Sequence, residues 1–435
     1  MRVTRERPVV AHVNYTFFHS TQSFIYHYLV ALRRFRAICL TRTPETSSIA
    51  GQRPAALADD LYAYEPRRGS RSALWSGGVA LRRTLTRLSP RVAEPVLASV
   101  DRRLTPRLRP DTDARAYLDW AEAIMRRREA QIIHAYFCPV GWRALELRRR
   151  LGVPLVVTSL GDDIAPTLPP WWQWWLRRDS EEPDYPSRLR ELFDEGELFL
   201  AEGPHLREQL IAYGCPPAKV RLQRMAVPLE RLPFRPRHPP EDRPPVILFA
   251  GRFCEQKGVL YALEAVNELR REGRELEFRL VGDETMTDGR YAARVYSYIR
   301  GEGLRDCVRL LGWQSNDRYV REMQNADIFL HPSVVDADGR GEGGAPTTIL
   351  EAQALGMPIV STLHCDIPYV TRPGQSALLV PERDSAALAD ALRTLLDHPE
   401  RWAEMGRAGR RHVEQNHDIS REAPRLEGHY LSLTR

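Results

Sequence analysis

The stretch GEGGAPTTILEAQALGMPIVS, residues 341–361, decides the fold class that the sequence predicts. Glycines gather at its start, at Gly339, Gly341, Gly343 and Gly344. Pro346-Thr347-Thr348 then favours the start of a helix. Apolar residues recur at helical spacing until Gly356 and Pro358, and the closing PIVS has the composition of a buried parallel strand. The stretch therefore predicts a loop, a helix and a strand of a parallel α/β sheet.

A glycine loop that leads into a helix N-terminus exposes backbone N–H groups to an anion, and the helix dipole favours negative charge there. Glu351 falls one turn into the predicted helix, where its carboxylate would accept hydrogen bonds from hydroxyl groups of a ligand. The alternative is an ordinary corner between a loop and a helix, with a solvated glutamate. The stretch alone leaves both interpretations open.

Length and composition narrow the class of protein. A chain of 435 residues exceeds a single hydrophobic core, so we expect two domains of roughly 200 residues each. No apolar run reaches the roughly 18 residues of a membrane-spanning helix, and the N-terminus lacks a signal-peptide core, so we expect a cytoplasmic protein. Six cysteines without a CxxC pair predict neither a zinc site nor a disulfide framework.

The net charge of +6 comes almost entirely from arginine, because Lys219 and Lys257 are the only lysines. Arginine clusters fall mainly before residue 150, at 67–68, 82–87, 102–109, 126–128 and 148–150. Such a face would suit anionic lipid headgroups at the inner face of a membrane. The alternative is an ordinary solvated face. No nucleic-acid-binding module organises this charge, so we expect no nucleic-acid partner.

Strand-like and helical runs alternate along the whole chain, which predicts doubly wound parallel sheets. We expect a first Rossmann-like domain at 1–235, a proline-rich linker at 236–245 and a second Rossmann-like domain at 246–417, with a helix at about 418–435 packing back on the first. Residues 55–130 are expected to be helical. Neither domain has GxGxxG after its first strand, which argues against a dehydrogenase. The absence of GxxxxGK[ST] and HExxH argues against phosphate-loop enzymes and zinc peptidases.

Two other segments stand out. PPWWQWWLRR at 169–178 would suit an interfacial anchor or an apolar acceptor channel, with a core-packing or lid role as the alternative. GRFCEQKG at 251–258 places Arg252 and Lys257 around a tight turn after the first strand of the second domain. Ligands of doubly wound sheets collect at this edge, and the two cations would bind a diphosphate and stabilise the charge that develops when it departs.

GRFCEQKG followed by GGAPTTILEAQALGMPIVST resembles the donor-binding half of the retaining glycosyltransferases of family 4, which have the GT-B fold. The N-terminal segments STQSFI, IIHAYF and VPLVVTSLGDD resemble their counterparts in the exopolysaccharide (colanic-acid-type) branch. The resemblance implies an α/β protein with two doubly wound Rossmann-like domains facing across a cleft. It covers most of the chain and is weak across about 45–125 and 165–190.

The resemblance also implies roles for individual residues. Arg252, Lys257 and Glu342 would be catalytic, and Glu351 would hold the ribose of the donor. The donor site would comprise Gly251, Arg252, Lys257, Gly312, Trp313, Gly343, Gly344, Ala345, Pro346, Thr347 and Glu351, with Gly312 and Trp313 beside the nucleobase. The acceptor side would comprise Thr21, Gln22, Ser23, His134 and Asp163, and for His134 a structural role is the alternative. No metal is expected, since the cations take its place.

The chain departs from the family pattern at two positions. The first Glu of the E-x7-E motif is replaced by Gly343, and Glu342 stands one residue early. Glu342 substitutes for it only if the glycine-rich loop rearranges, because a one-residue offset in an extended chain points a side chain the opposite way. The His of the family's H-G-x-D motif is replaced by Leu160, which bears on sugar recognition.

These features predict a metal-independent, retaining hexosyltransferase. Its donor would be a UDP- or GDP-linked sugar, and its acceptor a saccharide that is polyprenyl-diphosphate-linked in the favoured version. The setting would be envelope or exopolysaccharide biosynthesis, with peripheral contact to an anionic membrane. Two alternatives remain open: a catalytically silent GT-B protein that binds a sugar nucleotide or a partner, and a sugar-nucleotide epimerase.

Overall fold

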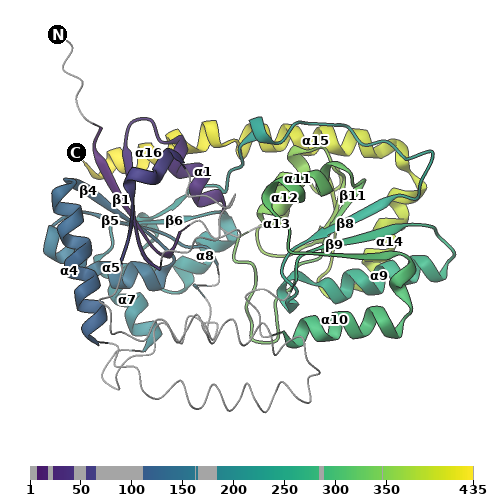
Figure 1. Cartoon of the computed structure of the whole chain (residues 1–435), viewed down its shortest axis with the longest axis horizontal. Coiled ribbons are helices and arrows are strands. Elements are labelled where there is room, and N and C mark those ends of the chain that lie inside the picture. The colour runs from purple at the N-terminus through teal and green to yellow at the C-terminus, as the bar shows by residue number, and fades with distance from the viewer. Residues whose placement is uncertain are drawn as a thin grey trace, which may run out of the picture.

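The computed structural model describes residues 7–17, 23–43, 55–64, 111–161, 163–164, 184–283, 289–344 and 346–434. These residues form two lobes that lie side by side, each a parallel sheet with helices on both faces (Figure 1). The predicted fold class of two doubly wound Rossmann-like domains is therefore confirmed.

The first lobe is built on a seven-stranded parallel sheet with the order β3-β2-β1-β4-β5-β6-β7. Its strands are β1 (Val9–Thr16), β2 (Arg36–Thr43), β3 (Leu61–Ala63), β4 (Ala130–Tyr136), β5 (Leu155–Thr158), β6 (Leu198–Ala201) and β7 (Val220–Leu222). Its helices are α1 (Ser23–Ala31), α4 (Asp111–Arg127), α5 (Cys138–Leu151), α7 (Tyr185–Glu195) and α8 (Pro204–Ala212). Strands β5 and β6 are buried along their whole length, as expected where helices cover both faces of a parallel sheet.

One expectation for this lobe was wrong in part. Residues 55–130 were expected to be helical, but Ala55–Asp60 form a short 3-10 turn and β3 adds an edge strand. A three-residue strand is too short to show an alternating pattern, so its sequence carries no signal for an extended chain. The helical expectation holds for α4, and residues 65–110 lie outside the described residues.

The second lobe has a six-stranded parallel sheet with the order β10-β9-β8-β11-β12-β13. Its strands are β8 (Val246–Ala250), β9 (Glu277–Val281), β10 (Val308–Gly312), β11 (Ile328–His331), β12 (Ile359–Thr362) and β13 (Ala377–Val380). Its helices are α9 (Val259–Arg271), α10 (Arg290–Gly301), α11 (Asn316–Gln324), α12 (Thr347–Ala354), α13 (Ile367–Val370), α14 (Ser385–Asp397) and α15 (Trp402–Asn416). Edge strand β13 has only one fully buried residue, which explains why its sequence did not stand out.

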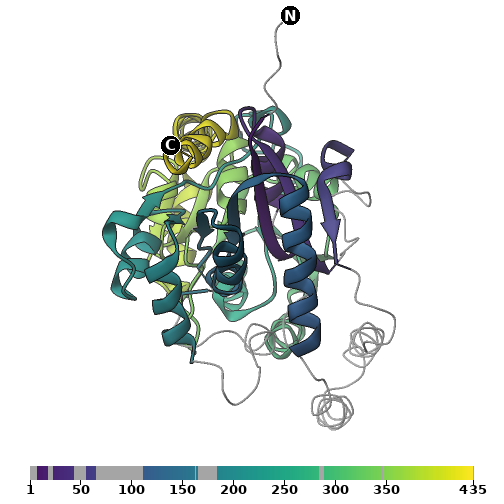
Figure 2. The ribbon, with the colours of Figure 1, turned by 90° about the vertical axis from the view of Figure 1, so that its left-hand side faces the viewer.

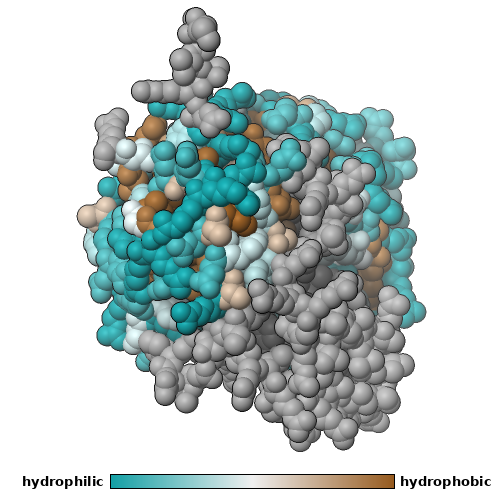
Figure 3. All heavy atoms as spheres, turned by 60° about the vertical axis from the view of Figure 1, so that its left-hand side comes forward, coloured by the Kyte–Doolittle hydropathy of each residue, from teal (hydrophilic) through white to brown (hydrophobic). Residues whose placement is uncertain are grey.

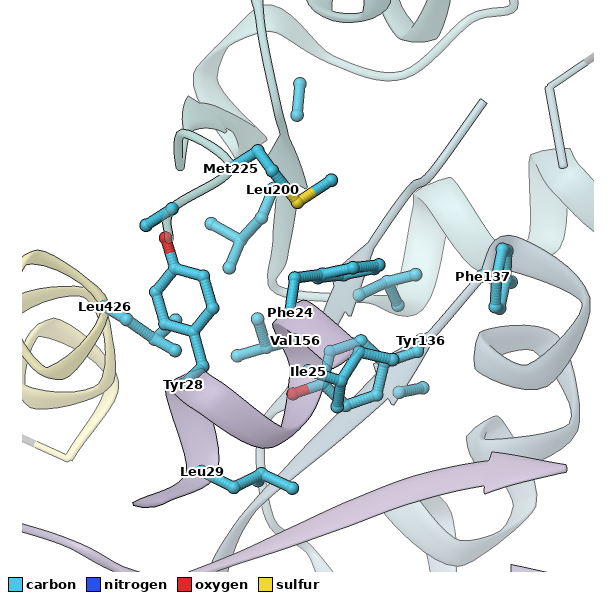
Figure 4. Packing of buried hydrophobic residues seen from close by; sticks show 14 of the residues in the cluster. Phe24, Ile25, Tyr28, Leu29, Tyr136, Phe137, Val156, Leu200, Met225 and Leu426 are labelled. Carbon is cyan, nitrogen blue, oxygen red and sulfur yellow. The ribbon is translucent and has the colours of Figure 1, made fainter. Parts of the chain in front are cut away.

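The C-terminal helix α16 (Ile419–Leu433) leaves the second lobe and crosses to the first, where it lies beside α1 (Figure 1). Its Glu427 Oε1 accepts hydrogen bonds from the backbone N–H groups of Arg33, at 2.7 Å, and Arg34, at 2.5 Å. Figure 4 shows Leu426 of α16 next to Tyr28 of α1. Burying a large apolar side chain contributes about 1.5–3 kcal/mol, so this packing ties the two lobes together.

Helices cover both faces of the first sheet. The paired helices α1 and α16 cover one face, and α4, α5 and α7 cover the other (Figure 2). Phe24 and Ile25 of α1 point into the cluster to which Val156 and Leu200 of the sheet contribute (Figure 4). The N-terminal end of α1 lies at the carboxyl edge of this sheet, because the helix follows β1 in the chain.

Candidate functional site

The two sheets meet at their carboxyl edges through glycines. Gly161 follows β5 and Gly343 lies in the loop before α12, and both have a positive φ, of 99° and 76°. A Cβ on Gly343 would come within 1.8 Å of the Cα of Gly161, so the two backbones are in direct contact. A Cβ on Gly344 would similarly come within 2.3 Å of Oε2 of Glu202. Only glycine permits this approach, and the glycine-rich loop is therefore the seam between the lobes.

The turn after β8 places Lys257 at this edge. Gly251 and Arg252 follow the strand directly, and a short 3-10 turn (Glu255–Lys257) leads to Gly258 and α9. Gly258 has a φ of 67°, and a Cβ there would come within 1.8 Å of the carbonyl oxygen of Pro332. This contact holds the turn against the end of β11.

Lys257 and Glu342 form a buried ion pair in which the ammonium group contacts Oε2. Their side chains are only 14% and 10% exposed. Ser333 Oγ donates a hydrogen bond to Oε1 of Glu342 at 3.0 Å, and the Glu342 backbone N–H donates to Nε2 of His364, also at 3.0 Å. Burial raises the pKa of Glu342, but Lys257 outweighs it, so the net pKa lies well below its usual range and the carboxylate is charged.

The glycine-rich loop directs Glu342, which stands one residue before the motif position, toward the turn after β8. Gly343 takes the left-handed conformation, which reverses the local direction of the chain, and Glu342 points toward Lys257. Arg252 is half-buried. Burial raises the pKa of Cys254, and the charges of Arg252 and Lys257 oppose this.

Glu351 lies in α12 and is 9% exposed. Tyr319 of α11 donates a hydrogen bond to its Oε2 at 2.5 Å. Burial raises the pKa of Glu351 to about 7, and the Tyr319 hydrogen bond opposes this only in part. Glu351 also lines a cavity of about 300 Å³ between the lobes, together with His27 of α1 and Asn316 of α11. It is therefore not the solvated glutamate of the alternative interpretation.

The other predicted donor residues lie along the same edge of the second sheet. Gly312 ends β10 with a φ of 66°, and Trp313, 38% exposed, follows it just before α11. Pro346 occupies the N-cap position of α12 and Thr347 is its first residue. Ala345 lies outside the described residues.

The acceptor-side prediction receives less support from the geometry. His134 is 1% exposed, and its ring nitrogens hydrogen bond to the hydroxyls of Tyr430, at 2.6 Å, and Thr158, at 2.7 Å. These bonds join β4 to α16 and β5, which favours the structural alternative for His134. Ser23 begins α1 and is half-buried. Thr21 and Gln22 lie outside the described residues.

Asp163 also lies inside the first lobe. Its carboxylate is fully buried and accepts hydrogen bonds from the backbone N–H of Cys138, at 2.7 Å, and of Leu160, at 3.0 Å. Cys138 begins α5, so Asp163 caps that helix and fixes the loop that carries Gly161. The side chain thus shapes the edge of the site from inside the domain, and both of its oxygens are engaged.

Several polar groups at the seam were not predicted. Asp366, after β12, accepts hydrogen bonds from the backbone N–H groups of His205, at 2.9 Å, and Leu206, at 3.4 Å, and so caps α8 of the other lobe. Glu202 is 7% exposed, and its pKa is raised well above its usual value by burial and by the charges of Asp366, Asp163 and Glu342. A sequence shows only that such residues follow strands, because their pairing arises from the contact between two domains.

The arginines of the cluster at 148–150 are paired with acidic side chains. Arg148, Arg149 and Arg150 contact Glu197 (2.5 Å), Glu191 (2.5 Å) and Asp119 (2.7 Å), and the surface in Figure 3 is largely hydrophilic. The clusters at 67–68, 82–87 and 102–109 and the tryptophans of 169–178 lie outside the described residues. Within the described residues, no helix is long and apolar enough to cross a membrane, and no three His, Cys, Asp or Glu side chains are grouped to hold a metal ion.

The fold defines the class of protein. The chain superposes on sucrose-phosphate synthase from Thermosynechococcus elongatus with a TM-score of 0.69 and 17% identity, covering 98% of this chain and 99% of that one. It superposes equally on Anabaena Alr3699/HepE in complex with UDP and glucose, with a TM-score of 0.69, 15% identity and coverage of 98% and 99%. The two lobes therefore have the GT-B fold.

The sequence of the second lobe is similar to those of known glycosyltransferases. Residues 244–398 match the family model described as glycosyl transferases group 1. The putative colanic acid biosynthesis glycosyltransferase WcaL is 32% identical in Salmonella typhimurium, over 62% of this chain and 63% of the relative, and 35% identical in Escherichia coli, over 60% and 61%. The amylovoran biosynthesis glycosyltransferase AmsK of Erwinia amylovora is 35% identical over 50% and 51%.

Residues 244–398 of the second lobe thus match group 1 glycosyl transferases, in agreement with the resemblance seen in the sequence. The chain spans between half and two thirds of the length of these relatives.

Proposed function

We propose that this protein is a retaining glycosyltransferase that moves a hexose from a nucleoside-diphosphate sugar to a saccharide in exopolysaccharide assembly. The observation that carries the proposal is the Lys257–Glu342 pair at the seam where the two sheets meet. The match to group 1 glycosyl transferases and the similarity to the exopolysaccharide glycosyltransferases WcaL and AmsK support it. A buried cation beside a glycine loop and a helix N-terminus is suited to a diphosphate.

In this proposal, Arg252 and Lys257 bind the diphosphate of the donor and stabilise the negative charge that develops as it leaves. Before the donor binds, Glu342 holds Lys257 in place. The loop from Gly343 to Thr347 contributes its amides. These groups do the electrostatic work that a divalent ion performs in other transferases, so the proposed reaction needs no metal.

Glu351 would hold the ribose. Its pKa of about 7 leaves it partly protonated near neutral pH, and the carboxylate form accepts hydrogen bonds from two hydroxyl groups. Gly312 and Trp313 would lie by the base, since they adjoin α11, whose Asn316 lines the same cavity as Glu351.

The acceptor side of the proposal rests on the first lobe. A polyprenyl-diphosphate-linked saccharide would enter past Ser23 at the start of α1, with the cytoplasmic face of a membrane close by. Flotation with anionic vesicles at low salt tests the membrane contact, and failure to co-float would contradict it. Binding to neutral vesicles is the matched control, because electrostatic attraction requires anionic headgroups.

Release of nucleoside diphosphate from UDP- and GDP-linked hexoses, with and without saccharide acceptors, tests the proposed activity. We expect release from one class of donor, lost in Lys257→Ala and Arg252→Ala. Lys219→Ala is the matched control, because Lys219 caps α7 carbonyls, donating to Phe193 and Asp194 at 2.8 and 2.7 Å. Release that persists in both site variants would contradict the proposal.

The anomeric configuration of the product, read by nuclear magnetic resonance, tests retention.

One observation favours a second candidate, a GT-B protein that binds a sugar nucleotide without turnover. The backbones of Gly161 and Gly343 touch, and Leu160 stands beside this contact in place of the family's histidine. Tight binding of a donor without release of nucleoside diphosphate under any acceptor condition would favour this candidate over the transferase.

A further inference from the structure

His331 is a buried histidine, and the packing around it does not explain why the side chain has polar ring nitrogens. It ends β11, is 1% exposed and stacks between Phe249 and Phe329, with ring centroids 5.3 and 5.8 Å away. Neither ring nitrogen has a hydrogen-bond partner among the described residues. A buried polar group without a partner costs free energy, and packing between two phenylalanines requires only a flat apolar ring. Phenylalanine would meet that requirement without the cost.

The edge of the imidazole is directed at the ion pair of the candidate site. Nε2 of His331 lies 3.9 Å from Oε1 of Glu342, just beyond hydrogen-bond distance. The other charged or titratable groups around it are Lys257, which pairs with Glu342, and His364. Burial lowers the pKa of His331, Glu342 acts in the opposite direction, and Lys257 and His364 add to the lowering. His331 is therefore neutral while Lys257 faces Glu342.

We propose that His331 takes up a proton when a diphosphate draws Lys257 away from Glu342, so that the buried carboxylate keeps a cationic partner. This inference rests on the proposed function, because it requires a diphosphate at Lys257. A proton from solvent binds Nε2, and the imidazolium then donates to Oε1 across a gap that needs only a small closure. The N–H bond formed at Nε2 is the one covalent bond that this step makes.

His331 is thus a positioning residue that acts through Glu342. With a protonated His331 beside it, Glu342 no longer competes with the diphosphate for the ammonium group of Lys257. Without it, binding must either leave Glu342 buried and unpaired or share Lys257 between two anions. Proton uptake is therefore linked to diphosphate binding, and the affinity for diphosphate falls as the pH rises.

Calorimetric titration of the full chain with UDP and GDP tests this linkage. Titrations at one pH near 7.5, in buffers of different ionisation enthalpy, count the protons taken up. We expect close to one more proton for the native protein than for His331→Phe, which keeps the stacking. The native affinity should fall with pH more steeply than that of the variant, by up to about tenfold per pH unit. The titration of the nucleotide itself cancels in this comparison.

His417→Gln is the matched control, because His417 is also fully buried with an unpaired Nε2, but its Nδ1 contacts the Met225 carbonyl in the first lobe. This variant should take up as many protons as the native protein. If His331→Phe fails to fold, Glu342→Gln serves in its place, since removal of the carboxylate charge should also abolish the extra uptake.

The outcomes separate the two proposals. Nucleotide binding with equal proton uptake in the native protein and His331→Phe would overturn the role of His331 and leave the proposed function standing. No binding of either nucleotide to the native protein would overturn both.

Discussion

The carboxyl edges of the two sheets use their polar residues differently. In the first lobe, Asp163 and His134 hydrogen bond within their own domain, to a helix N-terminus and to the C-terminal helix. In the second lobe, Lys257, Glu342 and Glu351 pair with one another or with Tyr319. The first edge is occupied with holding its fold, and the second has charged groups that a ligand can recruit. Polar residues after strands therefore do not by themselves mark a binding site.

Lys257→Ala should have the largest effect on stability and tests this contrast between the two edges. Removal of Lys257 leaves the buried Glu342 either without a cation or dependent on protonation of His331, and both cost free energy, so we expect a loss of up to about 3–5 kcal/mol in the free energy of unfolding. Denaturant titration measures it. Glu342→Gln in the same chain should restore most of the stability but none of the nucleotide binding. The control Lys219→Ala should cost less, because its partners are partly exposed carbonyls. Equal losses at both lysines would break the contrast.

The next largest effect is the contribution of Glu351 to the pH dependence of stability. Its pKa is raised to about 7 in the folded protein, so the folded state binds more protons than the unfolded state between the unfolded value near 4.5 and about 7. Stability contributed by this group therefore falls as the pH rises through that window, by at most about 3 kcal/mol. Glu351→Gln removes the dependence, so the variant should gain stability relative to the native protein between pH 5 and pH 8. A parallel pH dependence in both proteins would contradict the prediction.

Gly343→Ala tests the seam itself. Its Cβ would collide with Gly161, whereas Gly339 has a similar φ of 78° and no atom within 4 Å of a Cβ. Gly339→Ala therefore carries only the cost of backbone strain, of order 1 kcal/mol. We expect Gly343→Ala to cost about 2 kcal/mol more in unfolding free energy and to increase the radius of gyration in solution scattering. Identical behaviour of the two variants would mean that the lobes do not touch there in solution.

His134→Gln should give the smallest effect. Glutamine can keep one of the two hydrogen bonds, so we expect a loss of about 1 kcal/mol in the free energy of unfolding. The Michaelis constant for the acceptor should not change, because the residue is buried in the core. An altered Michaelis constant with unchanged stability would mean that His134 acts on the acceptor side. The carboxyl edges of both sheets would then carry ligand-binding residues.

Local patterns were sufficient for the fold class and for the position of the charged groups in the second lobe. The glycine loop before α12 and the turn at Lys257 each lie within a few residues, so their geometry follows from turn and helix chemistry. The direction of Glu342 depended on whether Gly343 would adopt a positive φ, which a sequence permits but does not require. Edge strands β3 and β13 were missed because short edge strands carry little periodicity.

The rest of the site depends on contacts between distant segments. The role inferred for His331 depends on its position beside Glu342, and that of Asp366 depends on its contact with the N-terminus of α8. His134 showed the converse, since its partner Tyr430 lies 296 positions away in α16. Such pairs are decided by how two domains and a returning helix pack, and no local pattern encodes them.

Thermal unfolding with nucleoside diphosphates tests the central claim, that the edge at Lys257 binds a diphosphate. UDP, GDP, ADP and dTDP would each be added in excess to the native protein and to Lys257→Ala. A ligand at 100 times its dissociation constant stabilises the folded state by about 2.7 kcal/mol. We predict that UDP or GDP raises the melting temperature of the native protein by several degrees and leaves that of Lys257→Ala unchanged. No rise with any nucleotide, or the same rise in both proteins, would contradict the claim.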